Sequence, residues 1–450
     1  MGTTETVAKW IVDTPYEDIP PEAYEQAKKS ILDYLGTTIL GTTTEVGRQI
    51  IDFTQDQGGN PQARVIATDI RTSSAAAAFA NGSIGHADDF DDLGGVGGHP
   101  ATVLTPTTLA VAEQMGLSGR EVLAAWAIGY EIGTRLSSNL HPDRDWHPTA
   151  IFGTMASAVA ASKLMGLDVE QTRMALGIAG SEAAGLRRNF GTMTKPFHPG
   201  NAARSGVVAA KLASTGFTAD PDIIEGRQGY ADNFGGVKCN IPAISQTLGD
   251  YYYLASQGTR IKPWPCCGGN HQMLTGLLDL IQHYEINPDN VESIEHVGPD
   301  APCTGALLRN EVNQGLEGKF CLRYNISAAI IDRKIDLSTF TDERASQADV
   351  QEFMERVRLS KNPDVESRRE HIADGNRDAR LKVQMRDGTL HDVELGTAYH
   401  LTGDEVLDKF RVNAGNVFGQ ERLGEPIQLV EGLADLDDIG TLMDAVTTGG

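Results

Sequence analysis

Alanine- and glycine-rich stretches recur through residues 1–260, and they restrict what this chain can fold into. Residues 75–80, 156–161 and 202–213 are rich in alanine, and residues 21–40 carry apolar side chains at helical spacing. Side-chain size at a helix contact sets how closely two helix axes approach. We therefore expect tightly packed helices with small residues at their contacts, in a compact core or at a dimer interface.

Helix starts are marked in the same part of the chain. Ser118-Gly119-Arg120-Glu121 has the form of a capping box, so we expect a helix from there to about Ser137. The segment from Asp168 to Gln171 predicts a similar start. Residues 1–260 are therefore expected to be mostly helical.

The pattern changes near Pro263-Trp264-Pro265. Helical segments are predicted beyond it, and strand-like segments flank Arg386-Asp387-Gly388, a strong hairpin turn. The expected helices cover residues 272–284, 318–332 and 404–410, and the expected strands cover 293–297, 380–385 and 389–395. We predict a mainly α protein with an inserted α+β domain: a large all-helical domain, 1–264 completed by 404–450, and a smaller α+β domain, 265–403.

Composition excludes several classes of partner. The chain has 450 residues, enough for two or three domains, and a formal net charge of −23 with a pI near 4.8. Such an acidic chain is a poor binder of nucleic acid or of an anionic membrane surface. It contains no apolar run of about 18 residues, the minimum for a membrane span. An anionic substrate would need a local cationic pocket.

Cysteine usage and the first residues bear on the compartment. The five cysteines are few and odd in number, and MGTTETVAKW lacks the features of a signal peptide. A reduced, cytoplasmic setting is the simplest interpretation. Lysine is scarce, with 13 Lys against 25 Arg, and an acidic, lysine-poor chain suits high salt. A halophilic source is a hypothesis that a salt series would test.

The segment Thr194 to Gly206 holds a lysine, a histidine and an arginine before a predicted helix. Basic groups beside a helix N-terminus suit an anion such as a carboxylate. Pro196 disfavours helical geometry at Lys195, so we expect Lys195 to be extended and directed at a carboxylate. His198 and Arg204 would bind an anion or lie on the helix surface.

The segment His86 to Pro100 is rich in aspartate and glycine. Asp88, Asp89 and Asp92 match DDxxD, a Mg²⁺-diphosphate motif of isoprenoid synthases, but the chain has no second acidic motif of that kind. The alternatives are a carboxylate that holds a histidine or lysine, or a solvated acidic loop. His99 follows the glycines, which let backbone approach a ligand closely, and precedes another predicted helix.

His147 precedes the helix predicted to start near Ala150. The helix dipole disfavours the cationic form of a histidine there, which leaves the imidazole able to accept a proton. The alternative is a capping or packing histidine.

A second Lys-Pro segment begins at Lys262, at the expected domain boundary, where pockets tend to form. Zinc held by Cys266, Cys267 and His271 is a rival interpretation, but adjacent cysteines lack the CxxC spacing. Further along, Arg323 could clamp a carboxylate and Tyr324 could donate to an oxyanion. Alternatively, that segment starts a helix whose aromatic side chains pack the small domain.

The segments TKPFHPGNAA, KPWPCCGGNH and GKFCLRY, in this order and spacing, resemble the MmgE/PrpD family over nearly the whole chain. The resemblance implies a large helical domain from both termini, a smaller α+β lid domain, an active site between them, a homodimer, and no metal or organic cofactor. The resemblance also implies that the positions used by cis-aconitate decarboxylases of this family correspond to Asp89, His99, His147, Lys195, Lys262 and Tyr324.

Three features bear on the reaction. Leu93 stands where those decarboxylases carry threonine, and Cys267 stands where they carry histidine. The family's 2-methylcitrate dehydratases have Ser-Asp-Asn after the His-Pro element, whereas Ala101-Thr102 follows His99-Pro100 here. Neither activity is fixed by these residues.

We predict a cofactor-independent lyase that acts on a small di- or tricarboxylic acid, with 2-methylcitrate-like dehydration first, cis-aconitate-like decarboxylation second and epimerisation third. A non-catalytic ligand-binding protein is the alternative from another class. The predicted catalytic residues are His99, His147, Asp89, Lys195 and Tyr324; the predicted substrate-binding residues are Lys262, Arg323, Cys267 and His198. No metal ligands are predicted.

Overall fold

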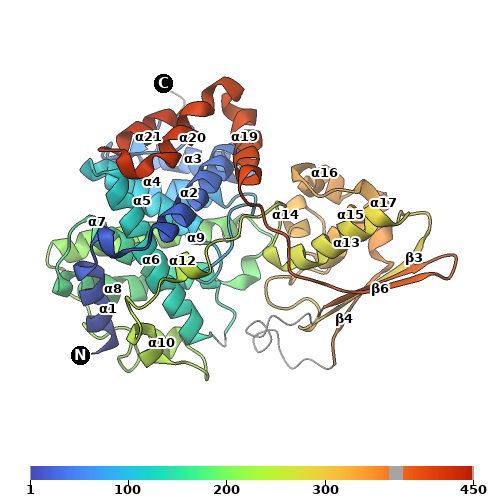
Figure 1. Ribbon diagram of the computed structural model, residues 1–450, viewed down its shortest axis with the longest axis horizontal. Helices are drawn as coiled ribbons and strands as arrows, with labels where there is room; N and C mark the ends of the chain where they lie inside the picture. The colour runs from blue at the N-terminus through green and yellow to red at the C-terminus, as the bar shows by residue number, and fades with distance from the viewer. Residues whose placement is uncertain (1, 143, 364–378, 448–450) are drawn as a thin grey trace. The chain divides into compact units, whose positions relative to one another are not determined.

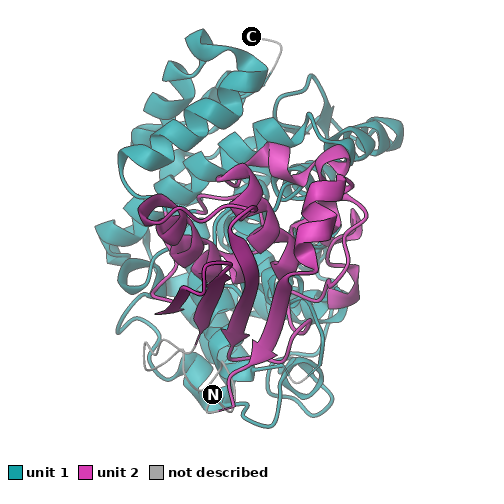
Figure 2. Cartoon of the chain, turned by 90° about the vertical axis from the view of Figure 1, so that its right-hand side faces the viewer, with its two compact units in different colours: residues 1–186, 196–261, 401–450 teal, residues 187–195, 262–400 magenta. Residues whose placement is uncertain are grey.

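A computed structural model describes residues 2–142, 144–363 and 379–447 of the chain (Figure 1). The chain forms two compact units, coloured separately in Figure 2. Unit 1 comprises residues 1–186, 196–261 and 401–450, and unit 2 comprises residues 187–195 and 262–400. The described part of the chain is mainly helical, as expected, with a four-stranded mixed sheet in unit 2 and a two-stranded sheet in unit 1. The domains expected at 1–264 with 404–450 and at 265–403 stay a prediction, because compactness does not show that a unit folds alone.

Unit 1 is built from helices around a large apolar core. The expected capping boxes are present: Ser118 caps α6 with Glu121, and Asp168 caps α8 with Gln171. α6 carries fully buried Trp126 and Tyr130 into the core. The longer helices are α1 (Thr3–Asp13), α2 (Pro21–Gly41), α3 (Glu45–Gln57), α4 (Ser74–Gly85), α5 (Ala101–Met115), α6 (Gly119–Leu140), α7 (Pro148–Leu164), α8 (Val169–Glu182) and α9 (Thr194–Ser214).

Small residues allow close helix contacts, as the alanine- and glycine-rich stretches predicted. A Cβ on Gly82 of α4 would lie 2.9 Å from the Gly200 Cα of α9. A Cβ on Gly206 of α9 would lie 2.4 Å from the Ala158 nitrogen of α7. No side chain larger than hydrogen fits at these two positions unless the backbone moves. α9 is thereby packed closely against α4 and α7.

The C-terminal segment returns to the start of the chain. Helices α19 (Asp404–Phe418), α20 (Gly424–Glu431) and α21 (Gly440–Ala445) belong to unit 1, and α19 packs along α2 (Figure 1). Lys409 of α19 forms a buried ion pair with Asp33 of α2, with Nζ and Oδ1 2.7 Å apart. Lys409 Nζ also donates to the Phe90 carbonyl at 2.6 Å. These contacts tie the segment after α4 to both helices.

Unit 2 combines a four-stranded sheet with short helices. Strand β3 (Val291–Gly298) pairs in parallel with β4 (Val357–Lys361) and antiparallel with β5 (Arg380–Met385), which pairs with β6 (Leu390–Glu394). The expected hairpin at residues 386–388 is confirmed. Helices α13 (His271–His283), α15 (Leu322–Asp332) and α17 (Ala348–Met354) share the apolar core of the sheet. Two strands of two residues in unit 1, β1 (Ala63–Arg64) and β2 (Arg71–Thr72), were not expected.

Across the described part of the chain, no helix is both long enough and apolar enough to cross a membrane.

Candidate functional site

The segment between α4 and α5 is an ordered loop held against α6. The Gly95 amide donates to the Tyr130 hydroxyl at 3.0 Å, and the Val96 amide donates to Thr134 Oγ1 at 3.2 Å. Asp89 and Val96 have φ values of 51° and 56°, in the left-handed region that residues other than glycine rarely adopt. Strained backbone of this kind persists only where its surroundings fix it, and it is common at functional sites.

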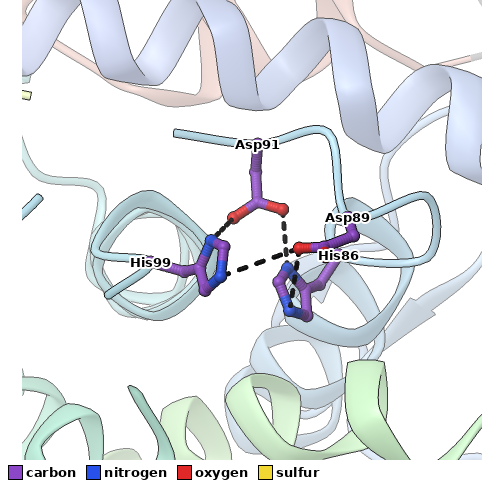
Figure 3. Close-up of side chains that lie close together, drawn as sticks. All are labelled: His86, Asp89, Asp91 and His99. Atoms are coloured by element: carbon purple, nitrogen blue, oxygen red, sulfur yellow. Dashed lines mark hydrogen bonds and ion pairs between the residues drawn. The ribbon is translucent and has the colours of Figure 1, made fainter. Parts of the chain in front are cut away.

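Asp91, a fully buried residue of this loop, binds two imidazoles at once (Figure 3). His86 Nδ1 lies 2.6 Å from Asp91 Oδ1, and His99 Nδ1 lies 2.9 Å from Asp91 Oδ2. His99 Nδ1 also lies 2.9 Å from the Asp92 carbonyl oxygen. Burial acts to raise the pKa of Asp91, but His86 and His99 together hold that pKa well below its usual range. Asp91 is therefore a carboxylate, and His86 Nδ1 donates to it. His99 Nδ1 donates to the Asp92 carbonyl and also lies at ion-pair distance from Asp91.

The other nitrogens of the same two rings face Asp89 (Figure 3). His99 Nε2 lies 3.7 Å and His86 Nε2 lies 4.0 Å from the same oxygen, Asp89 Oδ1. Because each Nδ1 already carries a hydrogen, each Nε2 carries one only when its imidazole is cationic. A proton taken up on either ring would therefore lie beside the Asp89 carboxyl, which stabilises it.

Two further buried histidines extend this group. His147, the N-cap residue of α7, and His198 of α9 approach each other with their Nδ1 atoms 3.0 Å apart. One of these nitrogens must donate and the other accept. The His147 ring centroid lies 6.5 Å from that of His86. We call His86, Asp89, Asp91, His99, His147 and His198 the imidazole array; all its residues lie in unit 1 and all are buried.

Asp92, the next residue, has a different environment. Its Oδ1 accepts from the Ala101 amide at the start of α5, at 3.1 Å. Burial and the negative charge of Asp91 raise the pKa of Asp92 well above its usual range. Asp92 therefore supports the helix start, in surroundings that favour the neutral form of its carboxyl. The DDxxD interpretation needs Asp88, Asp89 and Asp92 as a common set of ligands. Among the described residues, the group close enough to hold a metal ion contains Asp89 but neither Asp88 nor Asp92, which contradicts that interpretation.

Ligand-type atoms gather closely enough for a metal ion in one place among the described residues. His86, Asp89, Asp91 and His99 each offer an atom, and these atoms lie within 4.8 Å of one another. Asp91 Oδ1 already accepts a hydrogen bond from His86, and Asp91 Oδ2 lies at ion-pair distance from His99. Hydrogen bonds and ion pairs thus join these four residues to one another. Activity measured in the presence of EDTA tests whether these four residues need a metal ion.

Lys195 lies in unit 2, and its predicted extended conformation is wrong. Helix α9 already begins at Thr194, so Lys195 is in its first turn. Pro196 is tolerated there because amides of the first turn have no partner within the helix. The buried Lys195 Nζ lies 5.3 Å from the Phe190 ring centroid and 5.1 Å from that of Phe320. These cation–π contacts hold an ammonium in an apolar setting.

The second Lys-Pro segment is buried in unit 2. Lys262 is 0% exposed, and Cys267 packs with Phe190 and Phe320. Cys266 instead belongs to the main core of the unit, so the adjacent cysteines lie in different clusters. His271 Nε2 donates to the Cys266 carbonyl at 3.3 Å. Within the described residues, Cys266, Cys267 and His271 do not form a metal-binding group, which contradicts the zinc interpretation.

Arg323 and Tyr324 have structural partners in unit 2. Arg323 Nε donates to the Met354 carbonyl at the end of α17 at 3.1 Å, and its Nη2 pairs with Glu355 at 3.1 Å. The fully buried Tyr324 hydroxyl donates to the Thr339 carbonyl. Both arrangements match the alternative in which this segment packs the smaller unit. Their predicted roles toward substrate would require these bonds to be exchanged.

The predicted site residues thus fall into two sets. Unit 1 brings together Asp89, His99, His147 and His198; unit 2 holds Lys195, Lys262 and Cys267, with Arg323 and Tyr324 bound as above. Sequence reasoning missed His86 and Asp91. The signal was present in the spacing of His86, Asp91 and His99 around the acidic run, but a loop has no periodicity that shows which side chains converge.

Comparison with known proteins supplies an independent line of evidence. Residues 5–239 match the MmgE/PrpD N-terminal domain, and residues 264–434 match the MmgE/PrpD C-terminal domain. Cis-aconitate decarboxylases of Homo sapiens and Mus musculus are 28% and 27% identical, over 98% of this chain and 93% and 92% of their own lengths. A cis-aconitate decarboxylase of Aspergillus terreus is 26% identical over 98% of this chain and 95% of its own length.

Proposed function

Because the chain belongs to the MmgE/PrpD family, we propose that it is a lyase that acts on a small di- or tricarboxylic acid without a metal or organic cofactor. The family expected from the three sequence motifs is confirmed. The relatives named above are decarboxylases, and each match runs along almost the whole chain. Both facts support a lyase.

The observation that carries the proposal is the imidazole array. Lyases of this class move a proton at a carbon next to a carboxylate, and histidine is the side chain best suited to that work near neutral pH. Asp91 fixes the orientation of His99, and Asp89 lies where it stabilises the imidazolium. We assign proton transfer to His99, with His147 as the second predicted proton-transfer group.

The two buried lysines of unit 2 supply the cationic charge that such a substrate needs. We propose that Lys195 and Lys262 bind substrate carboxylates and stabilise the charge that develops on one of them. Cations act more strongly away from water, because the local dielectric constant is low. This local positive charge offsets the overall negative charge of the chain.

Decarboxylation is the first candidate reaction, since the named relatives are cis-aconitate decarboxylases. In that reaction the bond to a carboxylate carbon breaks, CO₂ leaves, and the remaining electron pair takes a proton from an imidazolium. Dehydration of a 2-methylcitrate-like acid, which the sequence favoured, becomes the second candidate. Dehydration stays a candidate because Leu93 and Cys267 differ from the threonine and histidine that the cis-aconitate decarboxylases carry at these positions. The homodimer and the cytoplasmic setting remain predictions.

Proton NMR of the purified protein tests the proposal, with cis-aconitate and 2-methylcitrate in separate samples that contain EDTA. A decarboxylated product from cis-aconitate would establish the first candidate, and loss of water from methylcitrate would establish the second. No turnover of either acid by folded protein would contradict both. Activity that EDTA abolishes and a divalent cation restores would contradict the cofactor-free mechanism.

A further inference from the structure

We propose that Asp91 and His86 are positioning residues: Asp91 holds the hydrogen of His86 on Nδ1, so the neutral His86 ring directs no Nε2 hydrogen at Asp89, and the Asp89 carboxyl is left to stabilise a proton on His99. Neither residue is among the site residues that the sequence predicts, and the comparisons name neither. The effect of these residues on turnover rests on the proposed function, whereas the tautomers do not.

The geometry of Asp91 carries the first part. Its Oδ1 lies 2.6 Å from His86 Nδ1, in a hydrogen bond, and its Oδ2 lies 2.9 Å from His99 Nδ1, in an ion-pair contact. A carboxylate can only accept, so His86 must donate from Nδ1. His99 Nδ1 faces the Asp92 carbonyl, also an acceptor, so it carries a hydrogen as well. A histidine whose Nδ1 donates to a buried carboxylate is held in one tautomer and one orientation.

The position of Asp89 carries the second part. Both Nε2 atoms face the same oxygen, at 3.7 Å from His99 and 4.0 Å from His86. The His86 and His99 ring centroids are 4.5 Å apart. If His86 changed tautomer, its Nε2 would carry a hydrogen directed toward Asp89. Asp89 would then be engaged by His86 and would stabilise a proton on His99 less well.

The two rings differ in one respect that makes the proposal testable. His99 Nδ1 has a second acceptor, the Asp92 carbonyl at 2.9 Å, which no side-chain change at position 91 removes. In Asp91→Asn, the asparagine has one carbonyl oxygen and one NH₂ group. We expect His99 to keep its Nδ1 hydrogen on the Asp92 carbonyl, and His86 to accept from the NH₂ group and move its hydrogen to Nε2.

The experiment is ¹⁵N NMR of the full-length protein labelled at histidine, over a pH series, for the wild type and Asp91→Asn. His86→Gln and His99→Gln variants assign the signals. The expected result is Nδ1–H on both neutral rings in the wild type, and a switch of His86 alone to Nε2–H in Asp91→Asn. The matched control is Asp92→Asn, which replaces an equally buried neighbour and is expected to leave both tautomers unchanged.

Steady-state kinetics on the acid that the protein turns over tests the effect on function. For Asp91→Asn, kcat should fall by at least about 10²-fold with little change in KM, because proton transfer is affected and carboxylate binding is not. An Nε2–H tautomer on either ring of the wild type would overturn the proposal, whatever the substrate. A His86 switch without loss of kcat would overturn the positioning role. Failure to find any substrate would contradict the proposed function. The tautomers of His86 and His99 would then decide the positioning proposal by themselves.

Discussion

Asp91 and Asp92 are adjacent carboxyls with the same full burial, yet their surroundings move their pKa values in opposite directions. Two imidazoles hold the pKa of Asp91 down, whereas burial and the charge of Asp91 hold the pKa of Asp92 up. Neighbouring acids whose pKa values are pushed apart by their surroundings are common where acid–base chemistry occurs. The difference also has a consequence for stability.

Asp92→Asn should raise the free energy of unfolding at neutral pH. A raised native pKa contributes stability below the unfolded value of about 3.9, and this contribution is lost as pH rises through the native pKa. Asparagine has no proton to lose. The difference in free energy of unfolding between the variant and the wild type should therefore grow from about pH 4 upward. Asp91→Asn should behave oppositely, because a lowered native pKa contributes stability above about pH 3.9. Urea unfolding over a pH series checks both, and parallel curves for the two variants would contradict this account.

Lys195→Met should raise KM for the polycarboxylate by about 10- to 100-fold, the equivalent of losing a hydrogen bond to a charged group of about 1.5–3 kcal/mol. Methionine keeps an apolar stem between Phe190 and Phe320, so the fold should survive. The control is Lys319→Met in the same unit, because Lys319 Nζ donates to the Pro265 carbonyl at 3.0 Å. That variant should lose stability and keep its KM. Equal KM values for the wild type and Lys195→Met would contradict carboxylate binding by Lys195.

Single residues were predictable where a local rule covers them. His147 was placed correctly at a helix start because its neighbour Pro148 is a typical first helical residue. Lys195 was misplaced because the rule about residues before proline was applied without the exception for the first helical turn. His86 and Asp91 were missed because their contacts depend on positive φ at Asp89 and on the path of a loop.

At the scale of elements, the α2–α19 contact should depend on the buried Lys409–Asp33 pair. Lys409→Met removes the ammonium that pairs with the buried Asp33 carboxylate. Breaking a buried pair in this way typically costs about 3–5 kcal/mol. Chemical denaturation measures this cost. The double variant Asp33→Asn/Lys409→Met removes both charges and should recover much of the loss. No difference between the single and double variants would contradict the importance of the pair.

Elements were predicted best where patterns are long and carry their own caps. Helices α2, α6 and α8 and the β5–β6 hairpin lie where the sequence indicated. The helix expected to end at Phe410 continues to Phe418, because its later residues Asn413 and Ala414 are buried by packing. Strand β4 was missed, since Val357–Lys361 is short and mostly polar. Its pairing with β3 comes from tertiary contact.

At the scale of the whole molecule, the net charge of −23 should make stability depend on salt. Like charges repel in the compact state, and ions at about 0.1 M screen charges that lie beyond about 10 Å. The melting temperature should therefore rise as NaCl is added to a salt-free sample, with sucrose at matched osmolarity as the control. A constant melting temperature across the series would contradict both this expectation and the halophilic hypothesis.

The most direct test of the central claim, that the imidazole array transfers a proton on a polycarboxylate, is turnover in D₂O followed by mass spectrometry of the product. For the decarboxylation candidate, wild-type protein should place one solvent deuterium on carbon, and His99→Gln should lower kcat by about 10²- to 10⁴-fold while the protein stays folded. Product formed at the wild-type rate by His99→Gln, with the same deuterium content, would contradict the assignment of proton transfer to this array.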